Sequence, residues 1–120
     1  MSMAASVLIV DDHAGFRSAA RRLLELEGYV VVGEAVDGLS AITEARRLRP
    51  DLVLLDIQLP DVDGFEVCER LCGNGDGPAV VLTSSRDAGD YGPCLDRTLA
   101  CGFVPKAELS GAGIADILPA

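Results

Sequence analysis

The stretch SVLIVDDHAGFR, residues 6–17, decides the fold because it joins an apolar run directly to two acids. The four apolar residues 7–10 are mostly β-branched, and polar residues flank them, which is typical of a β-strand buried on both faces. Asp11 and Asp12 follow at once, and a helical pattern begins shortly after them. Two carboxylates in this position belong either to a loop that meets water or to a functional site.

Strand-like and helix-like patterns alternate along the rest of the chain. This alternation indicates βαβ units and a parallel sheet. We therefore expect one α/β domain over residues 1–120. The five predicted strands are Val7–Val10, Val30–Gly33, Leu52–Leu55, Ala79–Leu82 and Gly102–Val104.

Helices are expected after each of these strands. The first has an apolar face that starts at Phe16, and Gly28 ends it. The second stops before Pro50, because proline disfavours helical backbone in the residue preceding it. Asp63 is the expected N-cap of the third helix. The fourth segment contains glycines and prolines, so we expect a short helix there. The last four predicted helices are Leu39–Leu48, Gly64–Cys72, one from Pro93, and Gly111–Leu118.

Composition limits the classes of function. The chain has 120 residues, 49% of them apolar, which suits one domain with its own core. Its formal net charge of −9 disfavours direct binding to nucleic acid or anionic lipid. No apolar stretch approaches the roughly 20 residues of a membrane span, and no signal-type run begins the chain. We expect a cytoplasmic protein that does not enter a membrane.

Cysteine and histidine do not form a recognisable metal cluster in the sequence. The spacing of the four cysteines matches no paired CxxC zinc site. Cys68 and Cys72 lie one helical turn apart, and we expect them to be small buried hydrophobes. His13 is the only histidine, so we expect it to have a structural or helix-start role. The other two cysteines are Cys94 and Cys101.

Polar residues follow four of the predicted strands. In an open parallel sheet the carboxyl ends of the strands meet at one edge, where ligands bind. Asp11 and Asp12 follow the first strand, Asp56 the third, Thr83 the fourth and Lys106 the fifth. If the strand order is the flavodoxin-like 2-1-3-4-5, the first and third strands are neighbours about 4.8 Å apart, so the three acids crowd one another.

Crowded carboxylates either take up a proton or recruit a cation. Oxygen ligands without histidine or thiolate favour a hard ion such as Mg²⁺, or Mn²⁺ in its place, which also accepts phosphate oxygens as ligands. A carboxylate can attack a phosphoryl group to form an acyl phosphate. The cation, the ammonium of Lys106 and the hydroxyl of Thr83 would each neutralise a different phosphoryl oxygen.

Four stretches together resemble the receiver domains of bacterial two-component response regulators. They are VLIVDDH, PDLVLLDIQLPDVDGFEV around Asp56, VVLTSS with Thr83, and CGFVPKAEL with Lys106, and they occur in the family's order. The stretch DDHAGFRSAARRLLE is similar to the receivers that precede LuxR/NarL-type helix-turn-helix domains. The resemblance implies the flavodoxin-like (βα)5 fold, with a five-stranded parallel sheet in the order 2-1-3-4-5.

The resemblance also implies a function and a set of roles. Asp56 would accept a phosphoryl group from a sensor histidine kinase, and Thr83 and Phe103 would form the conformational switch pair. Gln58 and Ser85 would tune the lifetime of the acyl phosphate. The ligands implied for Mg²⁺ are Asp12, Asp56 and the backbone carbonyl of Gln58, with Asp11 acting through water.

The output implied is transcription. DNA would be contacted only through a downstream helix-turn-helix domain absent from these 120 residues, although a stand-alone receiver is the alternative. A homodimer is possible through the first helix or the fourth and fifth elements. The domain would promote only its own phosphorylation and dephosphorylation and would not be an enzyme.

The sequence departs from the family pattern beside the lysine. Many receivers have proline after this lysine, whereas here Pro105 precedes Lys106 and Ala107 follows it. The local backbone and the coupling of the switch are therefore open. Leu59 stands where methionine is common, which is a volume-conserving exchange.

Two other functions compete with the receiver. A receiver-like scaffold could bind partners without phosphorylation, although such domains typically lack one of the site residues. A haloacid-dehalogenase-like phosphatase also uses an aspartate nucleophile, but it needs a second acid two residues later to protonate the leaving group. Gln58 occupies that position here.

Overall fold

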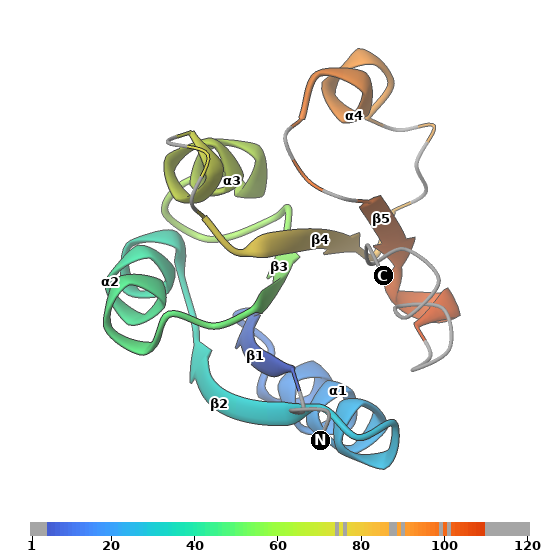
Figure 1. Ribbon diagram of the computed structural model, residues 1–120. Helices are drawn as coiled ribbons and strands as arrows, with labels where there is room; N and C mark the ends of the chain where they lie inside the picture. The colour runs from blue at the N-terminus through green and yellow to red at the C-terminus, as the bar shows by residue number, and fades with distance from the viewer. Residues whose placement is uncertain are drawn as a thin grey trace.

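The sheet is the centre of this computed structural model, which describes residues 5–73, 75, 77–86, 89, 91–98, 100 and 102–109, without the side chains of residues 96 and 97. Five parallel strands lie in the order β2-β1-β3-β4-β5, as Figure 1 shows. The predicted fold class and strand order are therefore confirmed. The strands are β1 (Ser6–Val10), β2 (Val30–Ala35), β3 (Leu52–Asp56), β4 (Ala79–Ser84) and β5 (Gly102–Pro105).

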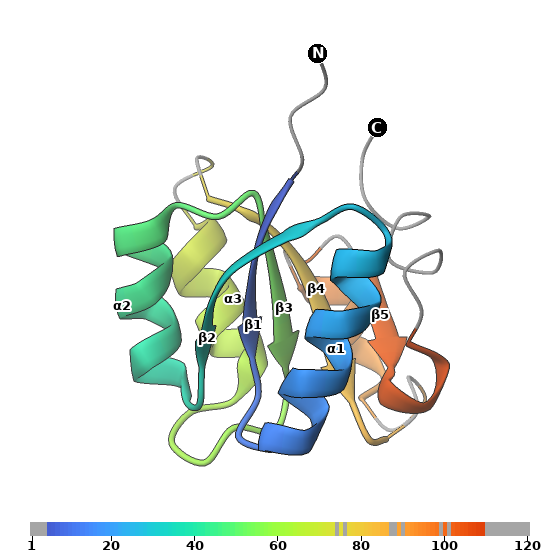
Figure 2. The same ribbon diagram turned by 90° about the horizontal axis from the view of Figure 1, so that it is seen from below.

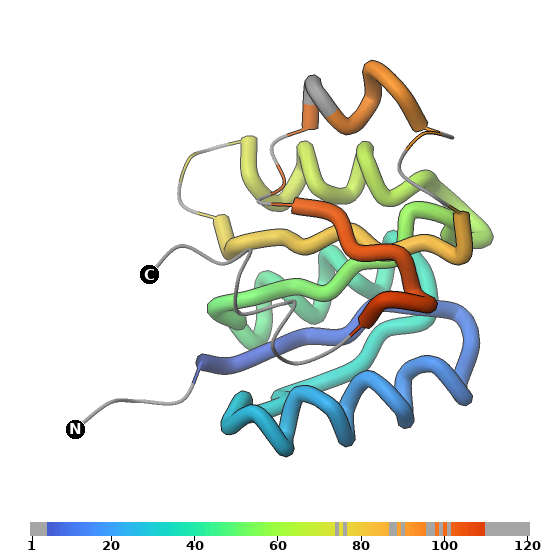
Figure 3. The backbone as a smooth tube through the Cα atoms, turned by 90° about the vertical axis from the view of Figure 1, so that its right-hand side faces the viewer, coloured from blue at the N-terminus to red at the C-terminus, as the bar shows by residue number. Residues whose placement is uncertain are grey.

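Helices cover both faces of the sheet. Helix α1 (Ala14–Leu26) lies on one face, and α2 (Gly38–Leu48) and α3 (Gly64–Cys72) lie on the other (Figures 1 and 2). The short helix α4 (Pro93–Arg97) lies beyond α3 on the side of the strands opposite α1 (Figure 3). A single 3-10 turn, η2 (Lys106–Glu108), follows β5. The predicted helix at 111–118 lies outside the described residues, as does Cys101.

The core has two layers, one on each side of the sheet. Every residue from Val7 to Val10 is at most 1% exposed, which confirms that β1 is buried on both faces. Alternate residues of β1 and β3 face α1 or the α2–α3 layer, as the two-residue period of a strand requires. Cys68 is fully buried in the second layer and Cys72 packs against it, as predicted. In the part of the chain that the structure describes, no helix has the length and apolar character needed to cross a bilayer.

Strands β3 and β4 continue further than the sequence predicts. Asp56 was expected after its strand but is the last residue of β3, and Thr83 lies inside β4. The two residues are partners in the β3–β4 ladder, and the Ile57 amide donates to the Thr83 carbonyl at 2.9 Å. The prediction stopped where apolar residues gave way to polar ones, whereas backbone pairing continues through them.

The helix ends follow the predicted signals. Helix α1 ends at Leu26, two residues before Gly28, whose φ is +93°. Helix α2 ends at Leu48, and its C-cap Arg49 has the left-handed φ of +47° just before Pro50. The Asp63 side chain accepts a hydrogen bond from the Glu66 amide at 2.9 Å, so Asp63 is the N-cap of α3.

Gly64 lets helix α3 start directly against the end of β3. Its amide donates to the Ile57 carbonyl at 2.7 Å. A Cβ atom at this position would lie 2.5 Å from the Asp56 carbonyl oxygen and 2.7 Å from the Ile57 Cα, both of them backbone atoms. Only glycine fits here without a backbone shift, and the backbone that would shift carries Asp56.

We expect Gly64→Ala to lower the free energy of unfolding by about 1–3 kcal/mol, the usual cost of overpacking a tight site. The matched control is Gly15→Ala, because Gly15 lies in the first turn of α1 with no atom within 4 Å of its added Cβ. That control should gain up to about 1 kcal/mol of helix propensity. Urea denaturation of both variants measures the difference, and equal stabilities would contradict this explanation of Gly64.

Candidate functional site

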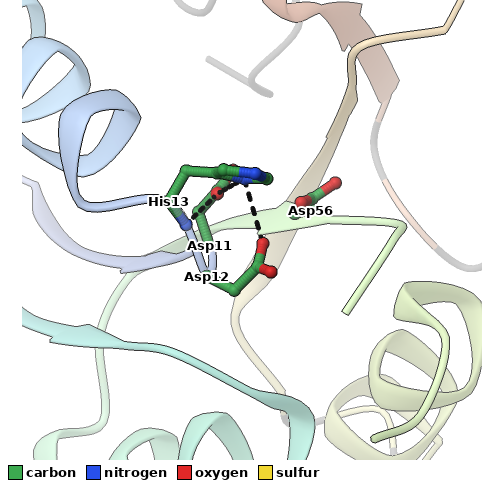
Figure 4. A group of neighbouring side chains, drawn as sticks. All are labelled: Asp11, Asp12, His13 and Asp56. Atoms are coloured by element: carbon green, nitrogen blue, oxygen red, sulfur yellow. Dashed lines mark hydrogen bonds and ion pairs between the residues drawn. The ribbon is translucent and has the colours of Figure 1, made fainter. Parts of the chain in front are cut away.

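Three acids and a histidine meet where β1 and β3 end. Asp11 and Asp56 are 0% and 2% exposed, whereas Asp12 and His13 are exposed. Each of these four residues offers one ligand atom, and the four atoms lie within 4.8 Å of one another. Figure 4 shows Asp11, Asp12 and His13 on one strand end and Asp56 on the neighbouring one. The predicted crowding of the three acids is therefore present.

Lys106 supplies the positive charge at the site. Its Nζ lies 2.6 Å from Asp11 Oδ2 and 3.4 Å from Asp56 Oδ2. The ammonium also lies 4.6 Å from the centre of the Phe16 ring, in a cation–π contact that holds the lysine against α1. Pro105 pairs with Ser84 as the last residue of β5, and Lys106 then begins the 3-10 turn. The Pro-Lys order thus brings the lysine to the acids.

His13 occupies the N-cap position of α1, which confirms the predicted helix-start location. Its side chain makes no cap hydrogen bond; Nδ1 instead lies 3.2 Å from Asp11 Oδ1 and 3.0 Å from Asp12 Oδ1. Dashed lines in Figure 4 mark these contacts. The sequence interpretation missed this contact, although the adjacency of the three residues in a tight turn was a usable signal.

Burial dominates the electrostatics of Asp56. Desolvation raises the pKa of its carboxyl, and the neighbouring Asp11 charge raises it further, while the Gln58 amide and Lys106 act in the opposite direction. The amide of Gln58 donates to Asp56 Oδ1 at 3.1 Å, and Oδ2 faces Lys106. The net direction is upward. Asp56 is thus an acid whose charge is costly to keep in the folded chain.

Thr83 and Phe103 lie on neighbouring strands beside Asp56. The Thr83 Oγ1 is buried and has no hydrogen-bond partner among the described residues. Phe103 is half-buried, and its ring centre lies 5.9 Å from that of Tyr91, whose hydroxyl is hydrogen-bonded to Ser84. A buried hydroxyl without a partner is uncommon in folded proteins and often marks a ligand position.

Gln58 and Ser85 lie at the exposed edge of the site. The Ser85 hydroxyl lies 3.5 Å from Gln58 Oε1, so the two side chains face each other across the ends of β3 and β4. Both residues are exposed. A group attached to Asp56 would meet solvent at this edge.

The loop after β3 is anchored by Asp61, which the sequence interpretation missed. Its carboxylate accepts hydrogen bonds from the amides of Gly38 at 2.7 Å and Leu39 at 3.0 Å, at the start of α2. These hydrogen bonds, that of Gly38 first, hold the pKa of Asp61 below its usual value. Asp61 and α2 are 22 residues or more apart in sequence, so no local pattern could reveal the contact.

The donor set fits a hard divalent cation. Three carboxylates supply oxygen ligands, and two of them come from adjacent buried strand ends that are crowded without a counter-charge. Phosphate oxygens complete the coordination of such ions in many proteins. The residues that could hold the ion are Asp11, Asp12, Asp56 and the backbone carbonyl of Gln58.

Comparison with known proteins gives consistent similarities. Residues 7–112 match the family model described as the response regulator receiver domain. The chain is 42% identical over 106 residues to protein-glutamate methylesterase/protein-glutamine glutaminase 6 of Anaeromyxobacter dehalogenans, covering 88% of this chain and 30% of that protein. It is 33% identical over 115 residues to the response regulator GacA of Pseudomonas viridiflava, covering 95% and 52% of the two chains.

A solved structure agrees with these relatives. The signal receiver domain of NarL from Mycobacterium tuberculosis superposes with a TM-score of 0.82 at 32% identity, covering 97% of this chain and 98% of that one. The chain thus spans about half of GacA and less than a third of the methylesterase, while it matches an isolated receiver domain over nearly its whole length.

We expect Asp61→Asn to destabilise the fold at neutral pH, because the asparagine loses the charge and one acceptor oxygen. A carboxyl whose pKa is lowered by folding contributes stability above its unfolded pKa of about 4, and this contribution is lost as the pH falls through the folded pKa. The difference from wild type should therefore shrink on acidification. Denaturant titrations between neutral and acidic pH check this, and a difference that stays constant with pH would contradict it.

Asp56→Asn should have the opposite effect on stability in the absence of metal. Because folding raises the pKa of Asp56, wild-type stability falls as the pH rises from the unfolded value of about 4 through the folded pKa. At neutral pH the variant should therefore melt a few degrees higher, as expected for a gain on the order of 1 kcal/mol. Thermal unfolding in a chelator measures this, and a variant that melts lower would contradict the predicted repulsion.

Proposed function

Because this chain belongs to the response regulator receiver domain family, we propose that it accepts a phosphoryl group on Asp56 in a Mg²⁺-dependent reaction. The observation that carries the proposal is the buried Asp56 carboxylate, with Lys106 Nζ 3.4 Å away and a second buried carboxylate, that of Asp11, on the adjacent strand. The 120 residues act as one receiver domain in this proposal.

The chemistry is a single transfer of a phosphoryl group. A carboxylate oxygen of Asp56 attacks phosphorus, a new O–P bond forms, and the P–N bond of the donor phosphohistidine breaks. The electron pair of that bond stays on the imidazole nitrogen of the kinase. Bound Mg²⁺ would supply charge neutralisation for the phosphoryl oxygens, held by Asp12, Asp56 and the Gln58 carbonyl, with Asp11 acting through water.

Two residues of the chain stabilise the product. Lys106 already lies between Asp11 and Asp56, so its ammonium can pair with a phosphoryl oxygen once Asp56 is modified. Thr83 offers a buried hydroxyl that lacks a partner among the described residues, and it donates to another oxygen. Movement of Thr83 toward the phosphoryl group leaves space into which Phe103 turns, and this pair is the proposed switch.

Residues at the open edge set the lifetime of the acyl phosphate. Gln58 and Ser85 face each other across the exit from Asp56, so they control how water approaches the phosphorus. We therefore assign them the tuning role and not a role in the transfer. The absence of an acid at position 58 also disfavours sustained phosphatase turnover, so the domain promotes only its own phosphorylation and dephosphorylation.

The partners proposed for the whole protein follow from its relatives. A sensor histidine kinase in the cytoplasm donates the phosphoryl group. The output is transcription through a DNA-binding domain of the same protein, and dimerisation accompanies activation. Relatives named as a response regulator and as a methylesterase share this domain, so an enzymatic output domain is the second candidate.

The test is intact-mass spectrometry after incubation with Mg²⁺ and acetyl phosphate. We expect wild type to gain one labile phosphoryl group, and Asp56→Asn and metal-depleted wild type to gain none. The matched control is Asp51→Asn, since Asp51 lies at the opposite end of β3, hydrogen-bonded to Ser6. No gain by wild type, under conditions that modify another receiver, would favour the phosphorylation-independent scaffold. Continuous phosphate release from a phosphomonoester would favour the phosphatase.

A further inference from the structure

Arg17 connects the acid pair to the edge strand of the sheet. Its Nη1 donates to the Asp11 backbone carbonyl at 2.8 Å, and its Nε donates to Glu34 Oε1 at 2.9 Å. The Arg17 side chain is only 16% exposed, which is unusual for an arginine. One guanidinium thus joins the first turn of α1, the end of β1 and strand β2.

Glu34 is itself fixed by a second arginine. Arg21 Nε lies 3.0 Å and Nη2 lies 2.9 Å from Glu34 Oε2, so each carboxylate oxygen contacts a different guanidinium. Burial of Glu34 acts to raise its pKa, but the hydrogen bonds from Arg21 and Arg17 outweigh burial and lower it. Glu34 therefore stays ionised at neutral pH and keeps Arg17 in place.

The backbone of Asp11 is held from both sides. Its amide donates to the Ala35 carbonyl of β2 at 3.1 Å, and its carbonyl accepts from Arg17. Strand β1 ends at Val10, so a side chain replaces the strand ladder at this carbonyl. The amide of His13 then donates to Asp11 Oδ1 at 2.8 Å. The turn that carries both acids is thus fixed through its backbone as well as its carboxylates.

We propose that Arg17 is a positioning residue for the cation site and that Glu34 and Arg21 support it. Arg17 is placed to act through the backbone of the Asp11–Asp12 turn, which it holds in the orientation that the cation needs. The inference rests on the Mg²⁺-dependent function proposed above. Removing hydrogen-bond partners that orient metal ligands typically lowers metal affinity about 10–100-fold.

The expected sign separates positioning from simple electrostatics. Removing a positive charge near two acids would strengthen cation binding if charge alone mattered. Removing an orienting hydrogen bond weakens cation binding. A loss of affinity in Arg17→Gln therefore cannot come from the change in net charge.

The experiment is calorimetric titration of Mg²⁺ into wild type, Arg17→Gln, Arg17→Lys and Glu34→Gln at fixed ionic strength, with circular dichroism showing that each is folded. We expect Arg17→Gln to bind Mg²⁺ about 10–100-fold more weakly. Arg17→Lys keeps the charge but lacks the two-way guanidinium, so it should be intermediate, and Glu34→Gln should weaken binding less. The control Arg22→Gln removes an exposed arginine of the same helix and should leave the affinity unchanged.

Each contrary result has a separate meaning. Arg17→Gln that binds Mg²⁺ as wild type does, or more tightly, overturns the inference even if its melting temperature falls, because Arg17 then only ties α1 to β2. If Arg17→Gln does not fold, Arg17→Lys and Glu34→Gln decide in the same way. A wild-type chain that binds no Mg²⁺ overturns the proposed function together with the inference.

Discussion

Repulsion between two buried carboxylates, Asp11 and Asp56, is the constraint on which the site depends. They lie at the ends of adjacent strands, where both are almost fully removed from solvent. Charges in this position cost free energy unless a counter-charge is close. Lys106 provides part of that charge, at 2.6 Å from one acid and 3.4 Å from the other. One ammonium between two carboxylates leaves a negative balance, which suits a divalent cation and a site where a phosphoryl group can be taken up.

The surrounding backbone keeps the acids in this costly arrangement. Gly64 allows α3 to start against the Asp56 carbonyl, and Asp61 ties the intervening loop to α2. Arg17 binds the Asp11 carbonyl on the other strand. These contacts come from three different helix starts, so the two strand ends cannot relax independently. Rigid support for residues that are individually unfavourable is typical of functional sites.

The sequence predicts much of this architecture because its signals are local. The apolar run before Asp11 and Asp12, the proline after α2 and the N-cap Asp63 are each readable within a few residues. Parallel strands then bring Asp56, Thr83 and Lys106 to the same edge. The roles of Asp61, Arg17 and Glu34 could not be predicted, since their partners are distant in sequence or are backbone atoms. The extra residues of β3 and β4 were missed because pairing, unlike hydropathy, continues through polar side chains.

The most direct test of the central claim is to locate the modified residue chemically. Acyl phosphates are reduced by borohydride, so a phosphorylated aspartate becomes homoserine and can be found by peptide sequencing. The account predicts homoserine at position 56 after treatment with Mg²⁺ and a phosphodonor, and unmodified aspartate at positions 11 and 12. Homoserine at another position, or none in a chain that carries a phosphoryl group, would contradict it.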